Sequence, residues 1–359
     1  MTDPTVALSL SGGGFRATAF GLGCLRALHD TGVLDMVNVV SGVSGGTLLA
    51  ALWAYGPDDF SDFDAITTGL LLGGLQHKLV ARVVSPAGIA RSTVSAAATM
   101  LPVKTLSTRP YNRTDALRAI LADELFGDRL VSDPNRPGLS TVLNATDLIT
   151  SRAVRFGSDN SSCSVHGRIT DPVTVAEAVA SSAAFPLGLP AVERTYKFER
   201  RGTTKPGRVN LTDGGVYDNL GLSVLDPDRS PNHTQHVYRA DYVIACDAGR
   251  QEKGRSAARL LPFRLKRSFD ITYRKTQDAS RGRLHAAKAA GQLDGFVHAY
   301  LGMRDSNLPV PVPRLVPMDQ VNDYPTNFRA MSPENYQAVT TRGEQLTRAL
   351  LAHYCPAII

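Results

Sequence analysis

Ser44 is the residue of this chain whose setting most favours chemistry. It lies in the turn Gly42-Val43-Ser44-Gly45-Gly46, between a β-branched run that ends at Ser41 and helix formers that start at Thr47. A strand-turn-helix elbow of the pattern Gly-x-Ser-x-Gly needs glycines where a Cβ would not fit, and it holds the serine hydroxyl exposed in a strained conformation. The free amides and the dipole at the start of the following helix favour a developing negative charge. The pattern therefore indicates a serine nucleophile.

Three consecutive glycines come just before this elbow in the fold that the sequence predicts. A short apolar run over residues 6–11, helical spacing over 15–28 and a strand over 37–41 predict a βαβ unit. A right-handed crossover makes its two strands parallel and places both turns at the same edge. Amides beside a nucleophile can bind the oxyanion of a tetrahedral intermediate, and losing one such donor typically costs ~10²–10³ in rate. The candidate donors are the amides of Gly12, Gly13, Gly14 and Gly45.

The same glycines fit a nucleotide site less well. Gly12, Gly14 and Ala17 satisfy Gly-x-Gly-x-x-Ala, but a dinucleotide site also needs an acid about 20 residues further on. The chain has the serine elbow at that place. A P-loop is excluded because no Gly-Lys-Ser/Thr follows the glycines.

A serine nucleophile needs a base, and Asp213 is the main candidate. It ends the strand-like run Asn210-Leu211-Thr212 and is followed directly by Gly214 and Gly215, as Ser44 is followed by glycines. Asp-Gly is also an ordinary turn, but no other base is evident near the serine. Asp218 and Asn219 could orient this loop. Asp247, at the end of the buried run 241–246, remains a rival acid.

Arg16 follows the glycines at the start of the predicted helix. A cation is disfavoured there by the helix dipole, so we expect it to have a carboxylate or phosphate partner. Either a structural ion pair or a contact with substrate would satisfy it.

Length and composition bound the class of protein. The 359 residues, 43% of them apolar, are sufficient for a large α/β domain, and the four cysteines are too scattered for a zinc site or a disulfide framework. We expect no metal and no cofactor. The first residues lack a basic segment typical of a signal peptide, and the longest apolar run, 66–75, is too short to span a membrane. A cytoplasmic location, with peripheral membrane contact at most, is the expectation.

The net charge of +6 is concentrated in one segment. Residues 250–288 contain twelve Lys and Arg against three acids, which leaves the rest of the chain slightly acidic. Such a run is most often a solvated helical face, but it could also contact an anionic membrane, at about 1 kcal/mol per basic residue. No aromatic interleaving or recognition motif supports a nucleic-acid partner.

Four segments, taken in order, resemble the patatin-like phospholipases. They are Ser11-Gly12-Gly13-Gly14-Phe15-Arg16, the elbow at 42–46, Ala180-Ser181-Ser182-Ala183-Ala184-Phe185-Pro186, and Asp213-Gly214-Gly215-Val216. The resemblance covers about residues 5–219. It implies a Ser/Asp dyad that hydrolyses acyl esters of membrane lipids without calcium. By position, Ser44 would be the nucleophile, Asp213 the general base and the glycines the oxyanion hole, with Arg16 supporting that loop or a head-group phosphate.

The resemblance also implies the architecture. We expect an α/β fold with three α/β/α layers and a mainly parallel central sheet, plus a basic helical C-terminal region. The whole chain, 1–359, is then a single domain with a motif core at 5–219, a possible helical cap at 60–130 and a C-terminal extension at 250–359. A helix after Ser332-Pro333 should dock against the body.

Two alternatives remain open. A Ser-Asp-His hydrolase could combine Ser44 with Asp213 or Asp247 and a later histidine, but only one strand is predicted before the elbow, whereas that fold has several. The candidate histidines are His285, His298 and His353. A non-catalytic module that binds lipid or a protein partner, with an idle serine, is the other alternative.

Overall fold

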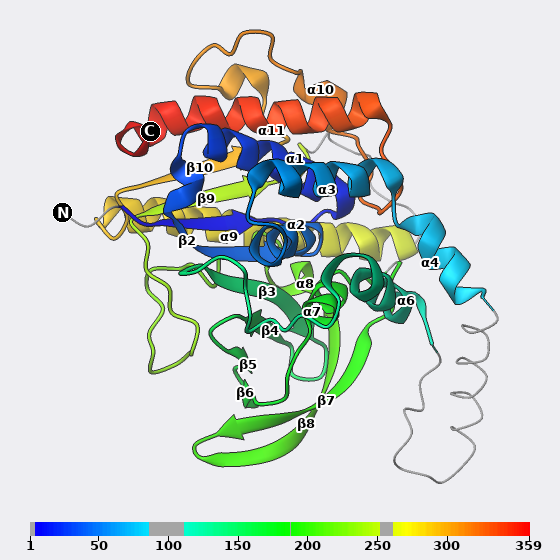
Figure 1. Cartoon of the computed structure of the whole chain (residues 1–359). Coiled ribbons are helices and arrows are strands. Elements are labelled where there is room, and N and C mark those ends of the chain that lie inside the picture. The colour runs from blue at the N-terminus through cyan, green and yellow to red at the C-terminus, as the bar shows by residue number, and fades with distance from the viewer. Residues whose placement is uncertain (1–3, 86–110, 187, 252–260) are drawn as a thin grey trace.

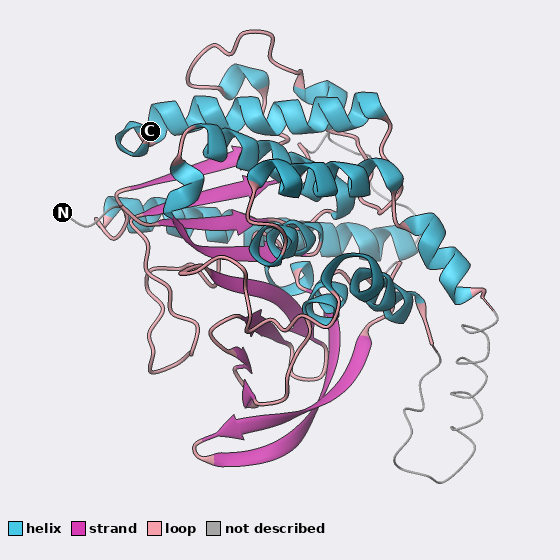
Figure 2. Ribbon diagram, viewed as in Figure 1, coloured by secondary structure: helices cyan, strands magenta, loops and turns pink. Residues whose placement is uncertain are grey.

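The computed structural model describes residues 4–85, 111–186, 188–251 and 261–359. In this part of the chain, one mixed sheet has the strand order β10-β9-β1-β2-β3-β4-β5-β6-β7-β8. Figures 1 and 2 show the sheet running through the molecule with helices on its faces. The strands are β1 (Val6–Leu10), β2 (Val37–Val43), β3 (Ser140–Asp147), β4 (Arg152–Gly157), β5 (Ser161–Cys163), β6 (Gly167–Ile169), β7 (Val192–Arg200), β8 (Thr203–Asp213), β9 (Tyr242–Asp247) and β10 (Gly295–Tyr300).

The α/β architecture is confirmed, but the prediction of a mainly parallel sheet is wrong. Strands β10, β9, β1, β2 and β3 are parallel, whereas every pairing from β3 through β4 to β8 is antiparallel. The cause is the length of the connections: β3 and β4, or β7 and β8, are joined by short turns, and a parallel pair needs a crossover of a dozen or more residues. Strands β7 and β8 form one long antiparallel hairpin.

Alternating side chains on the parallel strands form two apolar layers. Along β1, Val6, Leu8 and Leu10 belong to the large core under α1 (Gly14–Asp30), whereas Ala7 belongs to a second core with Leu284 of α9 (Leu261–Ala289). In Figure 1, α1 and α9 accordingly lie on opposite sides of these strands. The other helices are α2 (Gly45–Tyr55), α3 (Phe60–Gly73), α4 (Gln76–Val83), α6 (Arg113–Leu121), α7 (Val175–Ser182), α8 (Gly215–Asp218), α10 (Met318–Val321) and α11 (Pro333–Tyr354).

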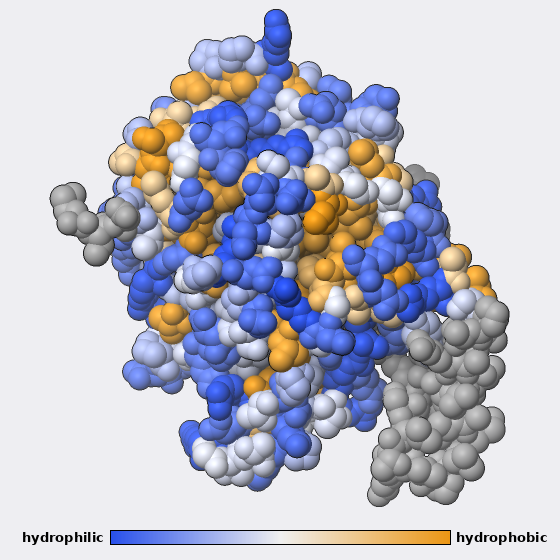
Figure 3. All heavy atoms as spheres, in the orientation of Figure 1, coloured by the Kyte–Doolittle hydropathy of each residue, from blue (hydrophilic) through white to orange (hydrophobic). Residues whose placement is uncertain are grey.

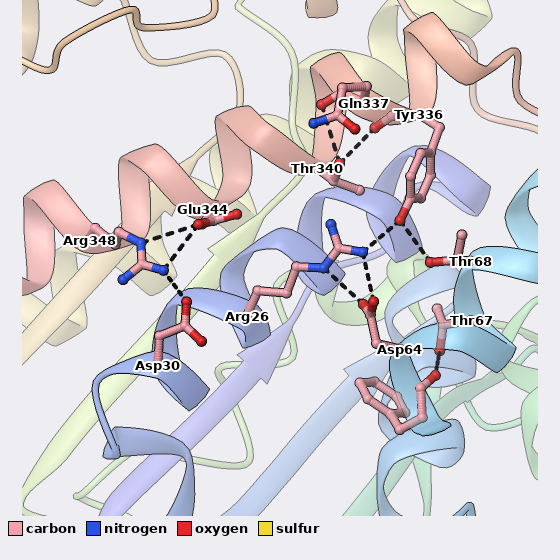
Figure 4. A network of polar contacts seen from close by, with 11 residues as sticks. Arg26, Asp30, Asp64, Thr67, Thr68, Tyr336, Gln337, Thr340, Glu344 and Arg348 are labelled. Carbon is pink, nitrogen blue, oxygen red and sulfur yellow. Dashed lines mark hydrogen bonds and ion pairs between the residues drawn. The ribbon is translucent and has the colours of Figure 1, made fainter. Parts of the chain in front are cut away.

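The C-terminal region belongs to the body of the fold. β10 is an edge strand of the sheet, and α11 packs along α1, as the sequence predicted for the last helix. The approach is close: a Cβ on Gly23 of α1 would lie 1.9 Å from the Thr340 carbonyl oxygen of α11. Figure 4 shows Arg26 of α1 bound to Asp64 of α3 and to the Tyr336 hydroxyl of α11, which ties the three helices together.

The segment expected to form a helical cap contributes three helices to the described structure, α3, α4 and α6, while residues 86–110 lie outside it. On the face seen in Figure 3, hydrophobic residues gather between α3 and α6, where Ile66 and Leu72 of α3 are exposed. Part of the basic run, residues 252–260, also lies outside the described structure. Among the helices that are described, none combines the length and the apolar character that crossing a membrane requires.

Candidate active site

Ser44 occupies a strained turn between β2 and α2. Its backbone has φ 52° and ψ −118°, a conformation that side chains other than glycine rarely adopt. The turn fits only glycine on either side, because a Cβ on Gly46 would lie 2.2 Å from the Leu10 carbonyl oxygen, and one on Gly42 would lie 2.7 Å from the Thr47 Cα. The elbow predicted from Gly-x-Ser-x-Gly is therefore present in its strand-turn-helix context.

One edge of β3 brings Ser44 and Asp213 together. The first part of this edge pairs in parallel with β2, ending at Asn144 opposite Val43. The next residue of β3, Ala145, pairs with Asp213 of antiparallel β8. The end of β2 and the end of β8 thus meet head to head, and the Ser44 side chain lies close enough to the Asp213 carboxyl group to lower its pKa.

The Asp213 carboxyl group is buried, and burial raises its pKa to about 6, against the opposing effect of hydrogen bonds from the Ser44 hydroxyl and the Gly215 amide. The Gly215 N–H donates to Asp213 Oδ1 at 2.7 Å. A carboxylate with this pKa is ionised at neutral pH and is a stronger base than an ordinary aspartate.

Ser182, at the end of α7, connects the two loops, a role that sequence reasoning missed. Its hydroxyl accepts the Ser44 amide N–H at 2.9 Å and contacts the Thr47 hydroxyl at 2.7 Å. Its carbonyl accepts the Gly214 amide at 3.2 Å, and two residues later the Ala184 carbonyl accepts the Asp213 amide at 3.0 Å. The small residues at 180–184 permit this close packing, so their run was the available signal.

The glycine loop lies against the elbow, as expected from the βαβ unit. Gly13 and Gly14 have φ 147° and 56°, and a Cβ on Gly45 would lie 2.0 Å from the Gly14 carbonyl oxygen. The Thr18 hydroxyl donates to the carbonyls of Gly45 at 2.9 Å and Gly14 at 3.3 Å, which links both turns. Within the described part of the chain, the amides of Gly13, Gly14 and Gly45 have no hydrogen-bond acceptor.

Gly12 does not fit the donor role expected for it. Its amide already donates to the Asn219 carbonyl at 2.9 Å, so it is not free to bind an oxyanion. A Cβ on Gly12 would lie 2.2 Å from the Asn219 side-chain oxygen and 3.4 Å from the Ser44 Cβ. Glycine is therefore required at position 12 for steric reasons. Asp218 accepts the amides of Leu220 and Ser223, so that Asp218 and Asn219 orient this loop as the sequence suggested.

Arg16 contacts backbone carbonyls rather than the expected carboxylate. Nε donates to the Ala248 carbonyl at 2.9 Å and Nη1 to the Tyr324 carbonyl at 2.8 Å. Burial and the nearby charge of Arg250 lower the pKa of Arg16 to about 10. A Cβ on Gly13 would lie 3.4 Å from Arg16 Nη2, so the guanidinium lies directly behind the glycine loop and holds it against two other loops.

The rival acid Asp247 is committed elsewhere. It pairs with Arg281 of α9 at 2.7 Å and with His298 of β10 at 2.9 Å. Burial would raise the pKa of Asp247, but the hydrogen bond and charge of His298, together with Arg281, outweigh burial and lower it to about 2. Strands β9 and β10 are two and three places from β2, or about 10 and 14 Å.

The other two histidines of the alternative triad have aromatic neighbours away from the elbow. His285 of α9 stacks edge-on against Phe296 of β10, and His353 lies beside Tyr354 near the end of α11. The described structure therefore brings Ser44 together with Asp213 and with none of the three candidate histidines.

Comparison with known proteins gives the same family as the motifs. Residues 8–226, more than half of the chain, match the family model described as patatin-like phospholipase. Human GIVD cytosolic phospholipase A2 is similar in structure, with 15% identity and a TM-score of 0.53 over 96% of this chain and 58% of that one.

Two further structures also match this chain. The human enzyme in complex with a methyl gamma-linolenyl fluorophosphonate inhibitor and terbium chloride matches with 15% identity and a TM-score of 0.50, over 96% of this chain and 57% of that one. VipD from Legionella pneumophila matches with 16% identity and a TM-score of 0.42, over 98% and 68%. This chain thus spans little more than half the length of the human protein. The family match and the shared fold together establish that the chain belongs to the patatin-like phospholipase family.

Proposed function

We propose that this protein is a lipid acyl hydrolase that cleaves carboxyl esters of membrane lipids through an acyl-serine intermediate. The observation that carries the proposal is the placement of Ser44, at the end of β2, beside the buried Asp213 carboxyl group at the end of β8. Next to them lie backbone amides without acceptors in the described structure. Membership of a phospholipase family supports lipid as the substrate class, as does the fold shared with a cytosolic phospholipase A2.

The geometry supports a two-step mechanism. Asp213 takes the proton of Ser44 Oγ as this oxygen attacks the ester carbonyl, and the amides of Gly13, Gly14 and Gly45 stabilise the oxyanion. Asp213 then gives the proton to the departing alcohol, which leaves an acyl-serine. In the second step Asp213 removes a proton from water as the water oxygen attacks the acyl-serine carbonyl. Asp213 then returns this proton to Ser44 Oγ as the bond between Oγ and the acyl group breaks, which releases the fatty acid and restores the free enzyme.

Labelling with a fluorophosphonate tests the nucleophile directly. A phosphonate that carries an acyl-like chain should react with Ser44 in the wild type and should not label Ser44→Ala. Asp213→Asn should slow labelling by at least 100-fold, because the hydroxyl loses its base. Ser61→Ala, which changes an exposed serine of α3, is the matched control and should label like the wild type.

The substrate class is tested separately by mass spectrometry of products after incubation with mixed lipid vesicles. We expect free fatty acids that appear with wild type and not with Ser44→Ala. Labelling that does not depend on Ser44 would overturn the proposed nucleophile. Labelling of Ser44 without fatty-acid release would contradict the proposed lipid substrate.

A further inference from the structure

Four large apolar side chains are exposed around the end of β8, where Asp213 lies. Leu148 and Ile149, in the β3–β4 turn, are 49% and 55% exposed, and Phe185 and Tyr217 are each 39% exposed. We call these four residues the apolar rim. Burial of large apolar side chains is strongly favourable, so several of them exposed around one site indicate a contact surface.

Backbone hydrogen bonds hold the three segments of the rim around the same strand end. The Leu148 amide donates to the Asn210 carbonyl of β8 at 2.9 Å. The Ala184 carbonyl, next to Phe185, accepts the Asp213 amide and the Thr212 hydroxyl. Tyr217 follows in α8, where its amide donates to the Gly214 carbonyl at 3.1 Å. The rim is therefore built into the same loops that position the candidate base.

Two arginines flank the rim without an acidic partner. Arg113, at the start of α6, is exposed and donates from Nη1 to the Gly188 carbonyl at 3.4 Å, beside the segment of Phe185. Arg152 is exposed at the first position of β4, directly after the turn of Leu148 and Ile149. Neither forms an ion pair with any acid in the described ranges of the chain.

The basic segment contributes less free charge than its composition suggests. Arg281 and Arg283 of α9 pair with Asp247 and Asp226 of the body, at 2.7 and 3.0 Å. Part of the positive charge in residues 250–288 thus neutralises acids inside this molecule, which makes the segment a poorer candidate for membrane contact than composition alone indicated.

We propose that the apolar rim, with Arg113 and Arg152, is the surface that docks on an anionic lipid bilayer. This inference rests on the proposed lipid substrate and specifies the face that meets it. Apolar side chains would enter the interfacial region while the guanidinium groups bind lipid phosphates and carboxylates at its surface. Docking in this orientation places the end of β8, and with it the dyad, at the bilayer surface, so that an ester has a short path to Ser44.

Vesicle sedimentation with Ser44→Ala protein tests the surface without any hydrolysis. The vesicles are phosphatidylcholine alone or phosphatidylcholine with about 30% phosphatidylserine. The anionic lipid gives the second set a negative surface potential, which attracts basic side chains. Ile149→Ser/Phe185→Ser should lower partitioning to both vesicles by at least ~10-fold. Arg113→Gln/Arg152→Gln should lower binding to the anionic vesicles only, by roughly fivefold for each arginine.

The matched control is Tyr354→Ser/Ile359→Ser, which removes two other exposed apolar side chains, 55% and 54% exposed, at the last residue of α11 and in the segment that follows it. It should bind vesicles like the parent. Rim variants that bind like the parent, or a parent that binds neither vesicle, would overturn the docking surface.

A second readout separates this inference from the proposed function. Each rim variant is also made with Ser44 intact and assayed on vesicles and on a water-soluble fluorogenic ester. The ratio of vesicle activity to soluble-ester activity should fall in the rim variants and not in the control. Rim-dependent vesicle binding without any Ser44-dependent hydrolysis would support the docking surface and contradict the proposed hydrolase activity. Ser44-dependent hydrolysis with the same vesicle-to-soluble activity ratio in the rim variants and the wild type would support the hydrolase and contradict the docking surface.

Discussion

As the proposed base, Asp213 must satisfy two opposing requirements at one position. To remove a proton from a serine hydroxyl, it needs a pKa well above that of a free aspartate, and burial supplies this. To be a base at neutral pH it must nevertheless be ionised, and the hydrogen bond from the Gly215 amide, together with the nearby Ser44 side chain, stabilises its charged form. A pKa of about 6 is the compromise between the two effects.

The pH dependence of hydrolysis should report this group. Because only ionised Asp213 can accept the proton, kcat/KM should rise with pH, with a midpoint near 6, and reach a plateau above pH 7. Initial rates on a water-soluble fluorogenic ester between pH 4.5 and 8 give the profile. A midpoint that shifts in His298→Asn would instead indicate an imidazole base and contradict the dyad.

The same pKa predicts a pH-dependent stability difference for Asp213→Asn. The native carboxyl keeps its proton up to about pH 6, whereas the unfolded one loses it near 3.8, so the wild type loses stability from this group as pH rises between these values. The free energy of unfolding that this group contributes thus falls by about 3 kcal/mol between pH 4 and pH values above 6. The melting temperature of Asp213→Asn should match that of the wild type near pH 4 and exceed it above pH 6. Equal differences at both pH values would contradict the raised pKa.

Gly45 tests the oxyanion loop. A Cβ at this position would lie 2.0 Å from the Gly14 carbonyl oxygen, so Gly45→Ala must push the glycine loop away from the elbow. We expect kcat to fall ~10²–10³-fold, the typical cost of one oxyanion donor. Gly69→Ala, where a Cβ meets open space on α3, is the matched control and should keep full activity. Full activity of Gly45→Ala in soluble, folded protein would rule out this loop as the oxyanion hole.

At the scale of elements, the site depends on a junction between two kinds of sheet. The parallel half delivers Ser44 at the end of β2, and the antiparallel half delivers Asp213 at the end of β8. Both strands use the same edge of β3, one after the other. The Thr146 hydroxyl of β3 donates to the Asp213 carbonyl at 3.0 Å and fixes the second strand at the junction.

Sequence reasoning identified both strand ends but could not predict that they meet on β3. Ser44 and Asp213 were recognised because glycines follow each of them, which is local information. The pairing of Ala145 with Asp213 depends on register between strands almost seventy residues apart, and no local pattern encodes it. Strands β5 and β6 of the antiparallel half were also missed, because three residues each are too few for a recognisable alternation of apolar and polar side chains.

Individual hydrogen bonds could not be predicted from the sequence either. Three adjacent glycines look equivalent in sequence, yet the Gly12 amide has an acceptor, the Asn219 carbonyl, and the amides of Gly13 and Gly14 have none in the described structure. Likewise, Asp213 and Asp247 both follow apolar strands. Only the position of Arg281 and His298 shows that Asp247 is an ion-pair partner.

Ser182 offers the test of α7 as a positioning element. Ser182→Ala leaves the buried Ser44 amide without its acceptor, which costs about 1–3 kcal/mol. We expect kcat to fall roughly tenfold with little change in KM, because the elbow loses a restraint while Ser182 itself is fully buried. Ser181→Ala is a matched control, since the buried Ser181 hydroxyl has no partner among the described residues. Equal effects of the two changes would show that the Ser182 contact is not specific.

At the scale of the whole molecule, the last helix, α11, stabilises the layer of the fold that contains α1. α11 packs along α1, which begins at Gly14 of the glycine loop, and its residue Arg342 is completely buried. The Arg342 guanidinium donates to the Leu301, Met303 and Val316 carbonyls and pairs with Asp305 at 2.9 Å. One side chain thus joins α11 to β10 and to the chain that follows it.

Arg342→Met should therefore destabilise the protein strongly without altering its chemistry. Removing a buried cation leaves several carbonyls without a donor, and we expect a loss of about 3–5 kcal/mol in urea unfolding. The control, Arg348→Met, removes an arginine 40% exposed that binds Glu344 and Asp30 at the surface (Figure 4), and it should cost less than about 1 kcal/mol. Because none of the groups that Arg342 binds belongs to the elbow or to the glycine loop, the activity per folded molecule should stay near that of the wild type at low temperature. A loss of activity before unfolding would mean instead that α11 holds the glycine loop in place through α1.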